Sequence, residues 1–184
     1  MTHEKILRDL LSLWFAPETG KLWFRSTDEF DDELRDRYEA LYLWARAGDL
    51  DALTADDELA LALVILLDQI PRNIYRHDGR RYETGEKAIK IARQVITRNG
   101  DQELNDSQKA FLYMPFMHSE NLDDQKESIR LFEQAGLESN ARFAKHHYDI
   151  VERFGRFPHR NEHLGRISTE DEVAWLNSDE GFSM

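Results

Sequence analysis

The sequence predicts an all-α protein, an antiparallel array of about eight helices joined by short turns. Apolar residues recur at three- and four-residue steps along most of the 184 residues, which is the period of an amphipathic helix. The alternation of apolar and polar residues that is typical of half-buried strands is absent from the sequence. Helix start signals also precede several of the periodic segments.

The first half of the chain supplies three of these helices. An apolar stripe over residues 6–15 predicts the first. Ser26 stands three residues before Glu29, which is the spacing of a capping box, and predicts a second helix that ends near Gly48. An acidic triplet then favours the start of a third helix, over residues 59–70, because negative charge stabilises a helix N-terminus. This segment is apolar on nearly every side, so we place it at the centre of the fold.

The second half continues the pattern. Amphipathic segments predict helices at residues 86–97, 107–116, 123–135 and 140–154. Thr169 and Glu172 have capping-box spacing and predict a last short helix, after which residues 177–184 are expected to form a tail. We expect residues 1–184 to fold as a single domain. Antiparallel helix pairs of this kind are compatible with a tetratricopeptide-like right-handed superhelix, but the sequence has no strict internal repeat and does not support a regular repeat array.

The composition limits the classes of partner. The formal net charge is −12, from 36 acidic and 24 basic side chains, and disfavours nucleic acid or an anionic membrane. A small anion is still a candidate, because a local arginine cluster can outweigh a screened, distant field. With no cysteine there is no disulfide, thiolate nucleophile or cysteine-ligated zinc site, and we expect no cofactor. The start of the chain lacks a signal-peptide pattern and its longest apolar run is too short to cross a bilayer, so we expect a soluble cytoplasmic protein.

Three segments share one design, in which an apolar helix is followed by a proline and a group of specific polar side chains. In the first, Asp68 and Gln69 close the central helix just before Pro71, Arg72 and Asn73. A carboxylate at the C-terminal end of a helix opposes the helix dipole and, when buried, needs a partner. We expect Arg72, Asn73 or a later arginine to supply that partner. Direct contact of these side chains with a ligand is the alternative.

The second segment contains His118 and Glu120, which follow Pro115. The proline is expected to kink or end its helix, because it removes a backbone hydrogen bond. On the turn that follows, a histidine and a glutamate two residues apart could act as a general base with its orienting carboxylate, or as metal ligands. In the structural alternative, Ser119 or Asn121 caps the next helix while His118 packs against its neighbours.

The third segment, residues 153–166, concentrates arginines in an otherwise acidic chain. Gly155 is expected to allow a sharp exit from the preceding helix. Arginine presents a planar fork of donors suited to carboxylate or phosphate. The candidate ligand-binding residues are His147 on the preceding helix, Arg156, Arg160, Asn161 and Arg166, with His159 as a candidate general base. The alternative is a structural corner in which the arginines pair with the surplus acids.

These motifs resemble those of a family of mostly bacterial proteins, the domain-of-unknown-function family nine-two-four. The resemblance covers nearly the whole chain and rests on long motifs: LLDQIPRN at 66–73, FLYMPFMHSE at 111–120, RFGRFPHRN at 153–161 and LGRIST at 164–169. It implies an all-α fold of the tetratricopeptide-like superfamily and no established activity. Of two adjacent histidines, His147 rather than His146 falls at the family's position. One departure lies near Gly85, where relatives more often carry an aspartate.

Three hypotheses for the function follow. The first is a binding module that holds a small anion or a carboxylate-bearing peptide through Arg72, Asn73, Arg156, Arg160, Asn161 and Arg166. The second is a small hydrolase, in which His118 or His159 is the base and Glu120 or Asp68 orients it; a metal-assisted version would use His118, Glu120, His147 and His159. The third is an interaction scaffold whose polar motifs only brace helix ends. The choice between a binding protein and an enzyme stays open at this point.

Overall fold

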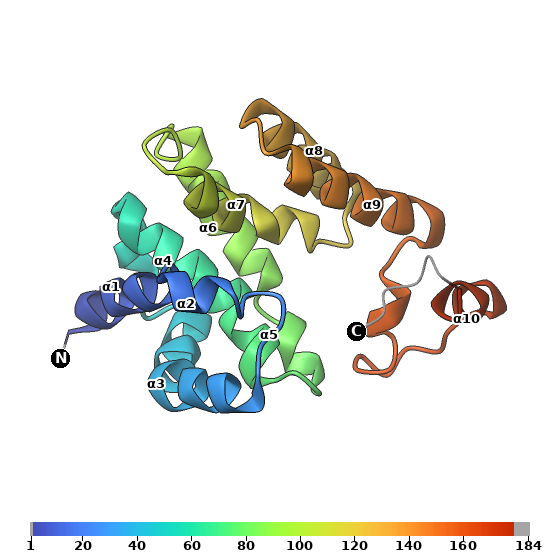
Figure 1. Ribbon diagram of the computed structural model, residues 1–184, viewed down its shortest axis with the longest axis horizontal. Helices are drawn as coiled ribbons and strands as arrows, with labels where there is room; N and C mark the ends of the chain where they lie inside the picture. The colour runs from blue at the N-terminus through green and yellow to red at the C-terminus, as the bar shows by residue number, and fades with distance from the viewer. Residues whose placement is uncertain (1, 179–184) are drawn as a thin grey trace. The chain divides into compact units, whose positions relative to one another are not determined.

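The computed structural model describes residues 2–178, and this part of the chain is 72% helix with no strand (Figure 1). The predicted all-α fold is confirmed. The helices are α1 (His3–Trp14), α2 (Pro17–Gly20), α3 (Asp28–Ala47), α4 (Asp57–Asp68), α5 (Ile70–Ile74), α6 (Gly85–Thr97), α7 (Asp106–Met117), α8 (Leu122–Gln134), α9 (Glu138–Phe154) and α10 (Glu170–Leu176). Three 3-10 helices join them: η1 (Asp51–Ala55), η2 (Gly79–Tyr82) and η3 (Pro158–Arg160).

Two local predictions need correction. The segment predicted as one helix over residues 59–70 ends at Asp68, and a separate short helix, α5, begins at Ile70. Pro71 lies in the first turn of α5, where its missing N–H would have had no partner within the helix. At the start of α3 the capping residue is Thr27, whose side chain accepts from the backbone N–H of Phe30. The predicted cap by Ser26 is therefore wrong by one residue.

The described residues pack into two compact units. Unit 1 contains residues 2–76 and 80–115. Helix α4 lies at its centre, in contact with α1, α3, α5 and α6 (Figure 1). All ten residues from Leu59 to Asp68 are buried. A helix that is apolar on all sides must be surrounded, so the central position predicted from its composition is confirmed.

Unit 2 contains residues 77–79 and 116–178. Its largest packing contact is the antiparallel pair α8 and α9 (Figure 1). Gly155 ends α9 with φ at 71°, a left-handed conformation that glycine adopts without strain, so the predicted sharp exit is confirmed. The chain then continues through η3 to α10, whose predicted capping box between Thr169 and Glu172 is present. Ile150 and Val151 of α9 form a small apolar core with Phe157 and Trp175 of this segment.

The short piece of chain at residues 77–79 belongs to unit 2 and passes close to the backbone of that unit. A Cβ atom on Gly79 would lie 2.5 Å from the carbonyl oxygen of His163, so only glycine fits there. Pro115 lies inside α7, which continues to Met117, so the proline does not end the helix. Of the predicted tail, Asn177 and Ser178 follow α10, and the rest lies outside the described residues.

Within residues 2–178, no helix has the length and apolarity needed to cross a membrane. The single domain and the tetratricopeptide-like superhelix stay predictions.

Candidate functional site

The predicted site residues divide between the two units. Unit 1 holds the first motif, Asp68, Gln69, Arg72 and Asn73. Unit 2 holds the remaining residues, His118, Glu120, His147, Arg156, His159, Arg160, Asn161 and Arg166.

In unit 1, Asp68 is the last residue of α4 and its side chain is almost fully buried. The Nε2 of Gln69 donates to its Oδ2 over 2.5 Å, and the Nη2 of Arg72 donates to its Oδ1 over 3.2 Å. The partner that a buried carboxylate at this helix end requires is thus Arg72, one turn further along the chain.

A second buried carboxylate in unit 1, Asp31, was missed by the sequence analysis. Its Oδ1 accepts from Asn73 over 2.8 Å and from Ser26 over 2.6 Å. Its Oδ2 accepts from both Nε and Nη2 of Arg76, over 2.9 and 2.5 Å. A signal was available, because Asp31 precedes the buried Leu34 by three residues and so shares its face of α3.

Arg81 lies beside these pairs and was also missed. Its Nη1 donates to the backbone oxygen of Arg76 over 2.7 Å, and its Cζ lies 5.2 Å from the centre of the Tyr82 ring. The Cζ of Arg72 lies 5.6 Å from the same ring centre. Burial and the positive charges of Arg72 and Arg76 lower the pKa of Arg81, against the opposing effects of Tyr82 and Asp31. We refer to Arg72, Arg76 and Arg81 as the arginine cluster of unit 1.

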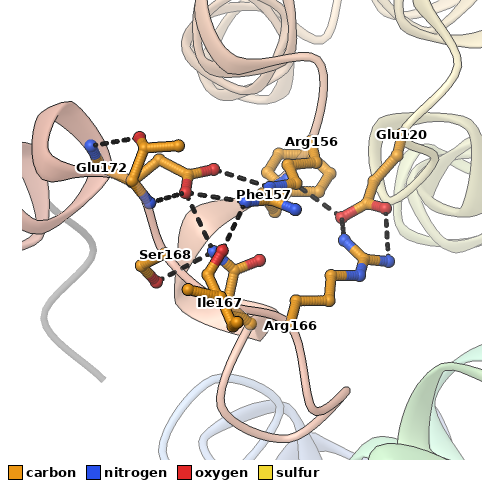
Figure 2. A network of polar contacts seen from close by, with 9 residues as sticks. Glu120, Arg156, Phe157, Arg166, Ile167, Ser168 and Glu172 are labelled. Carbon is orange, nitrogen blue, oxygen red and sulfur yellow. Dashed lines mark hydrogen bonds and ion pairs between the residues drawn. The ribbon is translucent and has the colours of Figure 1, made fainter.

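In unit 2, Glu120 is held by three N–H groups (Figure 2). Arg166 donates from Nη1 to Oε1 over 2.9 Å and from Nη2 to Oε2 over 2.8 Å, and the backbone N–H of Phe157 donates to Oε1 over 2.9 Å. Burial alone would raise the pKa of Glu120, but the hydrogen bonds and the charges of Arg160 and Arg166 outweigh it, so the pKa is lowered.

Glu172, the last member of the capping box, is the second carboxylate in this network (Figure 2). Arg156 donates to it from Nε over 2.7 Å and from Nη2 over 2.8 Å. Asn161 and the backbone N–H of Thr169 donate as well, over 3.3 and 2.8 Å. These bonds, led by that from Arg156, lower the pKa of Glu172 to about 2. The sequence identified Glu172 only as a helix cap.

The predicted histidines of unit 2 gather around the buried ring of Phe157. The ring centres of His147 and His159 each lie 5.5 Å from that of Phe157, and the Cζ of Arg160 lies 4.3 Å from it. His118 is 6.5 Å from His147 between ring centres, and its carbonyl oxygen accepts from the Nη2 of Arg160 over 2.8 Å. The structure therefore brings four of the predicted site residues together.

His147 has a defined tautomer. Its Nδ1 lies 2.8 Å from the carbonyl oxygen of Phe143, and a carbonyl can only accept, so Nδ1 carries the proton. Burial lowers the pKa of His147 to about 3 and outweighs the opposing hydrogen bond to Phe143, and the nearby charges of His118, His146 and Arg160 add to the lowering. The imidazole is neutral at physiological pH, and its Nε2 is then an acceptor.

The hydrolase hypothesis loses support from these contacts. Both oxygens of Glu120 are bound by Arg166, and one also by Phe157, so Glu120 is committed to a different role from orienting a histidine. Over residues 2–178, no group of three or more histidine and carboxylate side chains is placed so that it could hold a metal ion. The set of His118, Glu120, His147 and His159 that the metal-assisted version required is therefore not such a group.

Comparisons with known proteins agree with the sequence motifs. The profile of a family described as bacterial protein of unknown function (DUF924) matches residues 10–180. The solved structure of a protein of unknown function from Agrobacterium tumefaciens is similar, with 34% sequence identity and a TM-score of 0.88, covering 96% of this chain and 99% of that one. A comparison with curated proteins found no match. The resemblance seen in the motifs is thus confirmed, and the chain belongs to the DUF924 family of bacterial proteins.

Proposed function

We propose that the protein binds a small anionic ligand and that the arginine cluster of unit 1 provides the site. The observation that carries the proposal is the position of Arg81. Arg72 is paired with Asp68 and Arg76 with Asp31, whereas no carboxylate among residues 2–178 lies within ion-pair distance of Arg81. An anion at this position would supply the charge that the half-buried guanidinium lacks.

The local charge supports the same conclusion. The cluster brings three guanidinium groups together with the two carboxylates of Asp31 and Asp68. The positive charges of Arg72 and Arg76 also lower the pKa of Arg81, because the three guanidinium groups repel one another. A bound anion would relieve this repulsion, although the protein as a whole carries a net charge of −12.

The donors predicted in unit 2 are less suited to this role in the free protein. Arg156 and Arg166 each hold a glutamate through two hydrogen bonds, and Asn161 donates to Glu172 and to Ser168. A ligand there would have to replace an internal carboxylate that is already well placed. The contribution of these donors to ligand binding therefore stays a prediction.

Titration calorimetry with acetate, succinate, sulfate and orthophosphate tests the proposal. We expect the protein to bind at least one of these anions and Arg81→Gln to weaken that binding by roughly tenfold or more. Arg25→Gln removes an exposed arginine from the same unit and is the matched control, expected to leave binding unchanged. Absence of binding by the unmodified protein, or equal binding by Arg81→Gln, would contradict the proposal.

A second candidate, an interaction scaffold with internal braces, is favoured by the two Arg–Glu bridges of unit 2. These bridges join residues 16 and 46 positions apart, at Arg156 with Glu172 and at Glu120 with Arg166. Alanine substitutions at His118, His159 and Arg160 test the second candidate. A loss of several kcal/mol in unfolding free energy at all three positions, without loss of anion binding, would identify them as braces.

A further inference from the structure

The turn that follows α6 contains a chemically reactive pair of residues. Asn99 is followed by Gly100, and this is the only Asn-Gly pair in the sequence. The backbone nitrogen of the residue after an asparagine can attack the side-chain amide carbon, and glycine hinders this attack least because it has no Cβ. Asn99 is exposed, so water and solvent base can reach its side chain. The pair is therefore a candidate for spontaneous deamidation.

The folded turn restrains the nitrogen that would attack. Asn99 has φ at 61°, a left-handed conformation that asparagine tolerates at the end of a helix. Its N–H donates to the carbonyl oxygen of Ile96, and the N–H of Gly100 donates to that of Val95, both over 2.9 Å. These two bonds form a Schellman motif. The nitrogen of Gly100 must lose its proton to react, and a proton held in such a bond is lost only when the turn opens.

Packing explains why the residue after Asn99 is a glycine. A Cβ atom on Gly100 would lie 2.4 Å from the carboxylate atoms of Asp57. Arg98 holds this carboxylate, because its Nε donates to Oδ1 over 2.5 Å while its Nη2 donates to the carbonyl oxygen of Thr54 over 2.8 Å. A larger residue would have to displace the carboxylate, so the packing favours the residue that leaves Asn99 most reactive. Since Arg98 directly precedes Asn99, its two bonds also restrain the turn.

We propose that Asn99 is a deamidation site that reacts slowly while this turn is closed and rapidly once it opens. In the reaction the nitrogen of Gly100 bonds to Cγ of Asn99, the bond from Cγ to Nδ2 breaks, and ammonia leaves with the proton from Gly100. Water then opens the ring, which leaves an aspartate or an isoaspartate at this position. An isoaspartate adds one carbon to the backbone, so the N–H of Gly100 no longer reaches the carbonyl of Val95 in the same geometry. The modification therefore marks chains whose turn has opened.

The test incubates the full-length protein at neutral pH with and without denaturing guanidinium chloride, and follows each asparagine by peptide mass spectrometry. We expect Asn99 to react roughly tenfold or more faster in the denaturant, because the closed turn no longer protects it. Asn105 is the internal control, since it is also exposed but precedes Asp106, which has a Cβ. Equal rates for Asn99 in the two conditions would overturn protection by the turn. A rate in denaturant no faster than that of Asn105 would overturn the site itself.

A variant tests whether the side-chain contacts of the turn control the reaction. Arg98→Gln removes the bonds to Asp57 and Thr54, and should raise the rate at Asn99 in the folded protein by roughly twofold or more. Lys90→Gln changes an exposed cation of the same helix away from the turn, and is expected to leave the rate unchanged. The same rate in Arg98→Gln and the unmodified protein would overturn the restraint by Arg98. None of these outcomes depends on anion binding, so they test the inference independently of the proposed function.

Discussion

In the buried carboxylates of Glu172 and Asp31, each of the two oxygens accepts at least one hydrogen bond. Glu172 is only 2% exposed, yet it accepts from Arg156, from Asn161 and from the backbone of Thr169. Burying an ionised carboxylate without such partners would cost several kcal/mol. The donors to Glu172 offset this cost and so allow its carboxylate to be buried. Asp31 follows the same rule, with an arginine edge on one oxygen and an amide on the other.

A substitution at Glu172 tests how much this arrangement stabilises the fold. Glu172→Gln keeps the shape of the side chain but removes its charge and turns one acceptor into a donor that faces other donors. We expect the free energy of unfolding, measured by urea denaturation, to fall by about 2 kcal/mol. Glu170→Gln changes an exposed residue of the same helix and should cost less than about 0.5 kcal/mol. Equal losses for the two variants would refute a bracing role of Glu172.

The same residue predicts an acid-dependent loss of stability. The pKa of Glu172 is about 2 in the folded protein, below the usual value of about 4.3 expected when unfolded. A lowered pKa stabilises the fold fully above the unfolded value, and this contribution is lost as the pH falls toward the folded value. We therefore expect the urea midpoint to decrease between about pH 4.3 and pH 2, and to decrease less in Glu172→Gln. Parallel curves for the two proteins would rule out Glu172 as the cause.

The distant hydrogen-bond partner of a side chain was harder to predict than its role within its own helix. The capping box of Thr169 and Glu172 was predictable because both members lie within one helical turn. The partner of Glu172, Arg156, is 16 residues away, and its position depends on how the whole segment folds back. Arg81 was missed for the same reason, since its surroundings come from tertiary packing and no local motif marks it.

A helix could be predicted where its own sequence specifies it, and could not where it depends on packing against its neighbours. Long helices such as α3 and α9 were predicted because an amphipathic period repeats several times along them. Helices α2 and α5 have four and five residues, too few for a period to be recognised. Short helices of this kind depend on their neighbours, as the contact of α5 with α3 and α4 illustrates.

The end of α9 supplies a prediction at the scale of one element. Gly155 has φ at 71°, and a Cβ added there would meet no atom within 4 Å, so backbone conformation alone sets the cost of a substitution. Gly155→Ala should lower the free energy of unfolding by roughly 1 kcal/mol in urea denaturation. Gly85→Ala, at the open first position of α6, is the control and should be neutral or stabilising. An unchanged stability of Gly155→Ala would contradict this explanation of the helix end.

On the scale of the whole molecule, charge limits the partners. The net charge of −12 opposes the approach of a polyanion, and a local cluster of three arginines is too small to neutralise many phosphates. We expect no saturable binding of a labelled DNA or RNA duplex below roughly 10 µM at physiological salt, measured by fluorescence anisotropy. Binding that strengthens as salt is lowered would contradict this expectation.

The close contact between Gly79 and His163 has a practical consequence for dissecting the protein. Because residues 77–79 belong to unit 2 while the chain on both sides belongs to unit 1, no single cut in the gene yields both units with all their residues. A cut near residue 115 would also interrupt α7 and would leave residues 77–79 on the wrong fragment. Truncated fragments would therefore confuse loss of a function with loss of a piece of the fold. Point variants in the full-length chain are the appropriate way to assign a role to either unit.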